Sequence, residues 1–215
     1  MMLLAHHPEL IDALRAPTSA EPWRVLLSGC LAGWLCGVNG DDYGLGATLA
    51  DLRSLPTFRA LPFCPEQHAL GTPRTMPDIH GGDGFDVVAG RAKVFDERGE
   101  DLTARMLDGA RAMLEFAQRS RAELAIVTDM SAACGSQVIS DGCRLVEPRR
   151  YQKGVGVATA LLLEAGIPIV SQRDFRTLAL LRARLDPGYQ PPADARDHHQ
   201  HPWTVENLPG PHPRR

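Results

Sequence analysis

The length and composition of the chain limit the classes of protein to which it can belong. It has 215 residues, of which 44% are hydrophobic and 23% charged, proportions typical of a soluble globular protein with one substantial core. The net charge is −3 at pH 7 and the basic residues are dispersed, so the sequence carries no signal for a nucleic-acid polymer or an anionic membrane. A small nucleobase remains compatible with this charge.

The amino-terminal residues do not resemble a targeting signal. The apolar run from Met1 to Ala5 is shorter than the hydrophobic part of a signal peptide and is followed by His6-His7-Pro8. No stretch reaches the ~18 uninterrupted apolar residues of a membrane helix. We therefore expect a cytoplasmic protein with reduced thiols, so its five cysteines need an explanation other than disulfide bonds.

Apolar strands and amphipathic helices alternate along the chain. Buried strands are predicted at residues 24–28, 60–63, 123–128 and 167–171. The second of these contains Pro62, which should make it short. Apolar residues at helical spacing predict helices over Thr103–Arg119 and Val157–Ala165. This order predicts a single α/β domain with a mostly parallel sheet covered by helices on both faces.

The predicted domain does not extend over the whole chain. Residues 1–22 are interpreted as a leader segment with a short helix over Pro8–Arg15, and residues 23–173 as the α/β domain. An accessory helix is expected within 174–188. Proline-rich residues 189–215 are predicted to be mostly disordered. They include four of the eight histidines, to which the sequence assigns no role.

Three cysteines directly follow predicted strands: Cys30, Cys64 and Cys134. Because the carboxyl ends of parallel strands meet at one edge of a sheet, these thiols can converge there. Thiolates favour iron–sulfur clusters, zinc or copper(I). Cysteine also serves as a small buried hydrophobic residue, and no CxxC pair is present, so placement alone leaves both interpretations open. Cys36 is a candidate fourth ligand, whereas Cys143 lies in a probable turn and is interpreted as incidental.

Five stretches carry a family resemblance through their order along the chain. They are Val25–Gly40 (VLLSGCLAGWLCGVNG), Pro62–Arg74 (PFCPEQHALGTPR), Gly81–Asp101 (GGDGFDVVAGRAKVFDERGED), Ser131–Ser136 (SAACGS) and Gly154–Ser171 (GVGVATALLLEAGIPIVS). In combination they resemble the bacterial family known as domain of unknown function 523, which includes the thiouracil desulfidases. The resemblance covers about residues 24–172.

The resemblance implies an enzyme with a [4Fe-4S] cluster. Its three protein ligands would be Cys30, Cys64 and Cys134, which leaves the fourth iron for a substrate. Glu66 and Ser131 would face the cluster. The implied reaction is non-redox removal of sulfur from a small thiolated base such as thiouracil, or from a related thioamide, with Glu66 taking a proton from the attacking water. A monomer or homodimer is expected.

Simpler interpretations of Glu66 and Ser131 remain open. Glu66 follows Pro65 and could instead cap a helix or turn, and Ser131 could cap the turn of its loop.

The chain departs from the family pattern at several positions. It reads Cys36-Gly37-Val38-Asn39-Gly40 where the family usually has Cys-Arg-Tyr-Asp-Gly. It reads SAACG, from Ser131, where the family usually has Ser-Pro-Ser-Cys-Gly, and the lysine usually found upstream is replaced. The cysteine ligands are retained while polar neighbours change. This pattern supports the alternative of a non-catalytic iron–sulfur or zinc-binding protein, whereas the lack of a CxxC pair disfavours a redox thiol protein.

Overall fold

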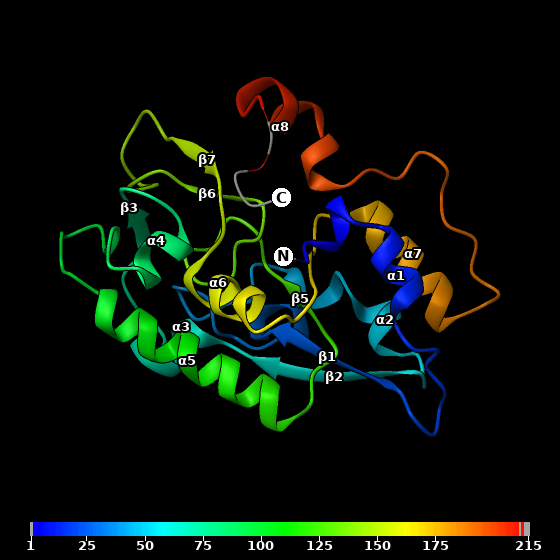
Figure 1. The fold of residues 1–215 in the computed structure, drawn as a ribbon. Coiled ribbons are helices and arrows are strands. Elements are labelled where there is room, and N and C mark those ends of the chain that lie inside the picture. Colours follow the sequence, from blue (N-terminus) through cyan, green and yellow to red (C-terminus); the bar gives the residue numbers. More distant parts are fainter. Residues whose placement is uncertain (1, 211, 213–215) are drawn as a thin grey trace.

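Four parallel strands form the central sheet, in the order β2-β1-β5-β8 (Figure 1). The computed structural model describes residues 2–210 and His212. The strands are β1 (Trp23–Ser28), β2 (Phe58–Phe63), β5 (Leu124–Val127) and β8 (Ile169–Ser171). In register, Leu27 of β1 lies opposite Pro62 of β2 and Ile126 of β5. The predicted α/β fold with a parallel sheet is confirmed.

Strand β2 is longer than the sequence predicts despite Pro62. It has six residues and lies at an edge of the sheet, where one side of the strand needs no partner. The missing N–H of proline is tolerated at such an edge.

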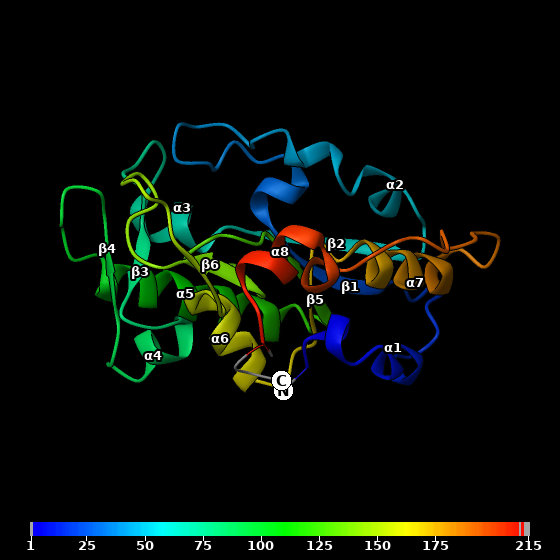
Figure 2. The same cartoon turned by 90° about the horizontal axis from the view of Figure 1, so that it is seen from above.

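The two faces of the sheet bury separate apolar cores, because side chains alternate along each strand. One core contains Leu26, Val127 and Ile169 and packs against α5 (Thr103–Arg119) and α6 (Val157–Glu164). The other contains residues of the alternate register and packs against three helices, α1 (Glu9–Ala13), α2 (Ala50–Arg53) and α7 (Phe175–Leu185). Figures 1 and 2 show α5 and α6 on one side of the strands and α1 and α7 on the other.

Shorter elements surround the sheet. Two antiparallel strand pairs join β3 (Asp78–His80) with β4 (Lys93–Phe95) and β6 (Val138–Ser140) with β7 (Tyr151–Lys153). The remaining helices are η1 (Leu4–His6), η2 (Gly29–Ala32), η3 (Leu45–Ala47), α3 (Pro65–Leu70), α4 (Gly84–Val88), η4 (His198–Gln200) and α8 (Pro202–Asn207). Among the described helices, none is both long enough and apolar enough to cross a bilayer.

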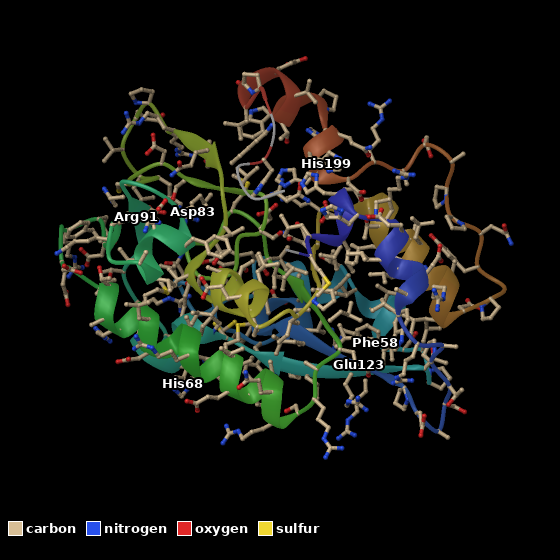
Figure 3. All side chains as sticks on the ribbon, viewed as in Figure 1. Phe58, His68, Asp83, Arg91, Glu123 and His199 are labelled. Atoms are coloured by element: carbon tan, nitrogen blue, oxygen red, sulfur yellow. The ribbon has the colours of Figure 1, made fainter. Side chains whose placement is uncertain are left out.

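The amino edge of the sheet is closed by ion pairs. Figure 3 labels Phe58, the first residue of β2, and Glu123, which directly precedes β5, at this end of the sheet, with β1 between their strands. The Glu123 carboxylate pairs with the Arg15 guanidinium at 2.5 Å and accepts the Arg24 backbone N–H at 3.0 Å. The loops that contain the cysteines leave the sheet at the opposite, carboxyl edge.

The segment after residue 188 differs from the sequence expectation of disorder. Its described part contains η4 and α8, and Trp203 of α8 packs edge to face on Tyr151 of β7 at 5.7 Å between ring centroids. Asp197 is 1% exposed and accepts hydrogen bonds from the Thr177 backbone N–H at 2.8 Å and hydroxyl at 2.9 Å. Buried polar contacts hold this segment in place. The expectation of disorder rested on the low apolar content of the segment, which gives no information about such contacts.

Candidate functional site

A cavity of about 410 Å³ lies at the carboxyl edge of the sheet, where the loops after β1, β2 and β5 meet. Its lining includes six of the residues considered in the sequence: Cys30, Cys36, Cys64, Cys134, Glu66 and Ser131. The three strand-following cysteines therefore border one space, as expected for parallel strands. Cys143 lies in the loop after β6 and does not line the cavity.

The first two cysteines are fixed by local structure immediately after their strands. Cys30 lies in η2, and its sulfur is 2.9 Å from the hydroxyl of Thr128 at the end of β5. Cys64 is the N-cap of α3, and its sulfur accepts the Gln67 backbone N–H at 3.3 Å. The two loops approach closely at Gly29, where an added Cβ would lie 3.1 Å from Cβ of Cys64.

Cys36 lies between Cys30 and Cys64 and is 2% exposed. Hydrogen bonding to both neighbouring sulfurs, together with burial, raises the pKa of the Cys36 thiol. The same contacts lower the pKa of Cys30 and of Cys64, outweighing the effect of their own burial. This arrangement places a protonated thiol between two groups that ionise readily.

Cys134 completes the set from the loop after β5. Burial raises the pKa of its thiol, and the negative charge of Cys64 adds to that effect. Its backbone N–H donates to the Ser131 hydroxyl oxygen at 3.0 Å, which shapes the turn that carries it. Ser131 therefore does cap this turn.

Glu66 is held by a cation and a hydroxyl at the wall of the cavity. Its Oε2 is 2.5 Å from the Arg74 guanidinium, and its Oε1 accepts a hydrogen bond from Ser131 Oγ at 2.9 Å. Both members of the ion pair are partly buried, with the Glu66 side chain 12% and the Arg74 side chain 6% exposed. The N-cap contact of α3 is made by Cys64, so the Glu66 carboxylate contacts Arg74 and Ser131 instead.

Sequence reasoning missed two charged residues at this cavity, Arg144 and Asp129. Arg144 donates to Asp78 Oδ1 at 2.6 Å and to the Met130 carbonyl at 2.7 Å. Asp129 is buried beneath the cysteine loop. Neither belongs to a motif, and the partners of Arg144 are distant in sequence, so no sequence signal indicated these contacts.

The donor set suits a thiolate-bound cluster. In the described part of the chain, no group of three or more His, Cys, Asp or Glu side chains could hold a single metal ion. The cysteines border a cavity instead, and iron–sulfur clusters are held by cysteine thiolates of this kind.

Comparisons with known proteins agree with this geometry. The sequence model of the 2-thiouracil desulfurase family matches residues 25–174. The uncharacterized protein YbbK of Bacillus subtilis (strain 168) is 33% identical over 156 residues, which cover 72% of this chain and 99% of YbbK. A solved structure, that of the [4Fe-4S]-dependent thiouracil desulfidase TudS, is 30% identical, with a TM-score of 0.61, and the match covers 75% of this chain and 98% of TudS. The chain thus belongs to the 2-thiouracil desulfurase family, as its sequence motifs predict.

Proposed function

We propose that this chain is an iron–sulfur-dependent enzyme that removes sulfur from the C=S group of a small thiolated base such as thiouracil. One observation carries the proposal: Cys30, Cys64 and Cys134 border the same cavity as the hydrogen-bonded pair Glu66 and Ser131. Membership of the family and the likeness to TudS support it.

Cys30, Cys64 and Cys134 would hold a [4Fe-4S] cluster as thiolates. When bound in this way, such a cluster supplies a soft Lewis acid, an iron without a protein ligand, that favours the sulfur of a thiocarbonyl. Cys36 would remain a thiol beside two of the ligands, because its contacts raise the pKa of its own thiol.

Glu66 would act as the general base. Its carboxylate would accept a proton from the water that attacks the C=S carbon, while Arg74 and Ser131 keep it in one orientation. Water adds its oxygen to the carbon, the C–S bond breaks, and sulfur leaves as hydrosulfide. No electrons are gained or lost, so the reaction needs no electron donor.

The cavity has the size and lining for a planar base. Its volume of about 410 Å³ falls within the ~300–1,000 Å³ typical of small-ligand pockets. Val38, Met76 and Met130 supply apolar surface, and Arg144 supplies a donor that would orient a carbonyl or ring nitrogen.

Sulfide release tests this function directly. Protein reconstituted anaerobically with iron and sulfide, then desalted, is incubated with 2-thiouracil or 4-thiouracil without a reductant, and both hydrosulfide and the oxygenated base are measured. We expect equal amounts of the two products. Cys64→Ser should remove both iron and activity, whereas Cys143→Ser, a change outside the cavity, should leave both intact.

A lack of sulfide release would contradict the proposal. If cluster-loaded wild-type protein releases none from several thiolated pyrimidines and thioamides, a non-catalytic iron–sulfur role replaces desulfuration.

A further inference from the structure

A buried hydrogen bond links the carboxy-terminal segment to the loop that carries Ser131 and Cys134. Nδ1 of His198, in η4, lies 2.6 Å from Oδ2 of Asp129, which follows β5. The two side chains are 5% and 0% exposed. His198 lies beyond residue 174, where the family match ends, so this contact comes from a part of the chain outside the matched region.

Asp129 organises the loop that carries Ser131 and Cys134. Its Oδ1 accepts backbone N–H groups of Ser136 at 2.9 Å, Gln137 at 3.1 Å and Val138 at 3.2 Å. Asp129, at the start of the loop, is thus hydrogen-bonded to residues 136–138, at its end. His198 binds the other oxygen at 2.6 Å, and the Ser171 hydroxyl donates to it at the longer distance of 3.3 Å, so the ring is the closer of the two side chains that orient the carboxylate toward these donors.

The segment that carries His198 is itself anchored to β8 and α7. The His198 backbone N–H donates to Asp174 Oδ1 at 3.1 Å. Asp174 also accepts a hydrogen bond from the Gln137 amide, so the same group contacts the end of the cysteine loop. Asp197 is bound by Thr177 of α7, as described above. His198 is therefore presented to Asp129 from a fixed support.

We propose that His198 is a positioning residue, which holds the loop of Ser131 and Cys134 in the arrangement that binds the cluster. The inference rests on the proposed function for its cofactor. His198 acts through Asp129 and touches neither substrate nor cluster. Groups hydrogen-bonded directly to metal ligands typically change metal affinity or activity ~10- to 100-fold when removed, and His198, which acts through Asp129 and the loop backbone, is expected at the lower end of that range.

Iron release from the holoprotein tests the role of His198 without substrate. Full-length cluster-loaded protein is mixed anaerobically with an iron chelator, and the loss of cluster absorbance is followed. His198→Leu keeps most of the side-chain volume but removes the donor to Asp129. We expect iron release about 10-fold faster than in wild type. In His198→Asn the side-chain amide can replace Nδ1 as donor, so the wild-type rate should largely return.

A matched control separates positioning from general stability. Thr177→Val removes the hydroxyl bond to Asp197 but keeps the Thr177 backbone N–H bond to Asp197 Oδ1, so the support of the segment and the His198–Asp129 contact stay in place. Its iron release should stay near the wild-type rate even if its melting temperature falls. If His198→Leu does not fold, His198→Ala, which leaves space for a water molecule, is measured in its place.

Three results would overturn the inference: wild-type iron release in the Leu or Ala variant, equally fast release in Thr177→Val, or no recovery in His198→Asn. None of them depends on turnover. Failure of the wild-type protein to release hydrosulfide would instead contradict the proposed function, so the two failures are distinguishable.

Discussion

The hydroxyl of Ser131 joins two parts of the site, because it donates to Glu66 Oε1 at 2.9 Å and accepts the Cys134 backbone N–H at 3.0 Å. A candidate base and the turn of a candidate ligand are thereby linked through one oxygen. Ser131→Ala should remove both contacts. We expect lower turnover together with weaker cluster retention, measured as sulfide release and iron per chain, whereas loss of only one of the two would separate these roles.

Replacing Glu66 tests the general base. Glu66→Gln keeps the shape of the side chain but removes the proton acceptor. General-base catalysis typically contributes ~100- to 10,000-fold, so turnover should fall on that order while iron content stays at the wild-type value. Full activity in an iron-loaded Glu66→Gln protein would remove Glu66 from the mechanism.

Replacing Arg74 tests how Glu66 is held. Arg74 also donates to the carbonyl of Cys36 at 2.9 Å, so its guanidinium connects the candidate base Glu66 with the loop that carries Cys36. Arg74→Met leaves a partly buried carboxylate without its cation, which should cost less than the ~3–5 kcal/mol typical of fully buried pairs. We expect a lower free energy of unfolding and reduced turnover. Arg74→Lys keeps the charge without the fork of donors, so its turnover should lie between those of Arg74→Met and wild type.

The main strands and helices could be predicted because each has a recognisable pattern of apolar residues within its own stretch of sequence. The helix predicted at Thr103–Arg119 is found with those bounds, since its apolar residues repeat at helical spacing. The antiparallel pairs β3–β4 and β6–β7 are not predicted by the sequence. Their strands have three residues each, too few for an alternating pattern to stand out, and their pairing joins residues far apart in the chain.

The sequence predicts those candidate site residues that directly follow strands. It does not predict those that are held by contacts with distant parts of the chain. Cys30, Cys64 and Cys134 follow strands, so the topology of a parallel sheet brings them together. His198 lies in a proline-rich stretch with few apolar residues, and a buried contact to Asp129, 69 positions away, leaves no periodic signal. The buried polar contacts that hold the segment after residue 188 can therefore be recognised only in the three-dimensional structure.

The number of cysteine ligands is tested by comparing Cys36 with Cys64. We expect Cys36→Ser to retain iron, because Cys36 would remain a thiol between two proposed ligands, and Cys64→Ser to lose it. Iron and acid-labile sulfide per chain are measured after anaerobic reconstitution. Equal loss in both variants would indicate four cysteine ligands and no open iron, which favours an electron-transfer or structural role.

The Asp129–His198 pair predicts a specific pH dependence of stability. Burial alone would raise the pKa of Asp129, but His198 and the backbone donors outweigh it and hold the pKa below its usual value. The stabilisation is therefore fully present above the unfolded pKa of about 3.9 and is lost as pH falls through the folded pKa. In urea unfolding of cluster-free protein, Asp129→Asn should be less stable than wild type at pH 7. The difference should shrink below about pH 4, and a constant difference would contradict the assignment.

The turn of Cys134 is also fixed from behind, by Gly156 at the start of α6. An added Cβ there would lie 2.4 Å from the carbonyl carbon of Ala133, and the Gly156 backbone N–H donates to the Gly135 carbonyl at 2.7 Å. Gly156→Ala must displace the turn, because backbone atoms rather than a flexible side chain are in the way. Overpacking of this kind typically costs ~1–3 kcal/mol.

Gly188→Ala is the matched control, since its Cβ would approach only the Asp186 carboxylate, at 3.4 Å. We expect Gly156→Ala to lower the melting temperature by roughly 2–12 °C, given ~2–4 °C per kcal/mol for a chain of this length, and to bind less iron. Gly188→Ala should change neither quantity appreciably. Because Ser131 and Cys134 share this turn, Gly156→Ala should lose turnover at least in proportion to its iron. Wild-type iron content and stability in Gly156→Ala would mean that the turn can shift without consequence for the site.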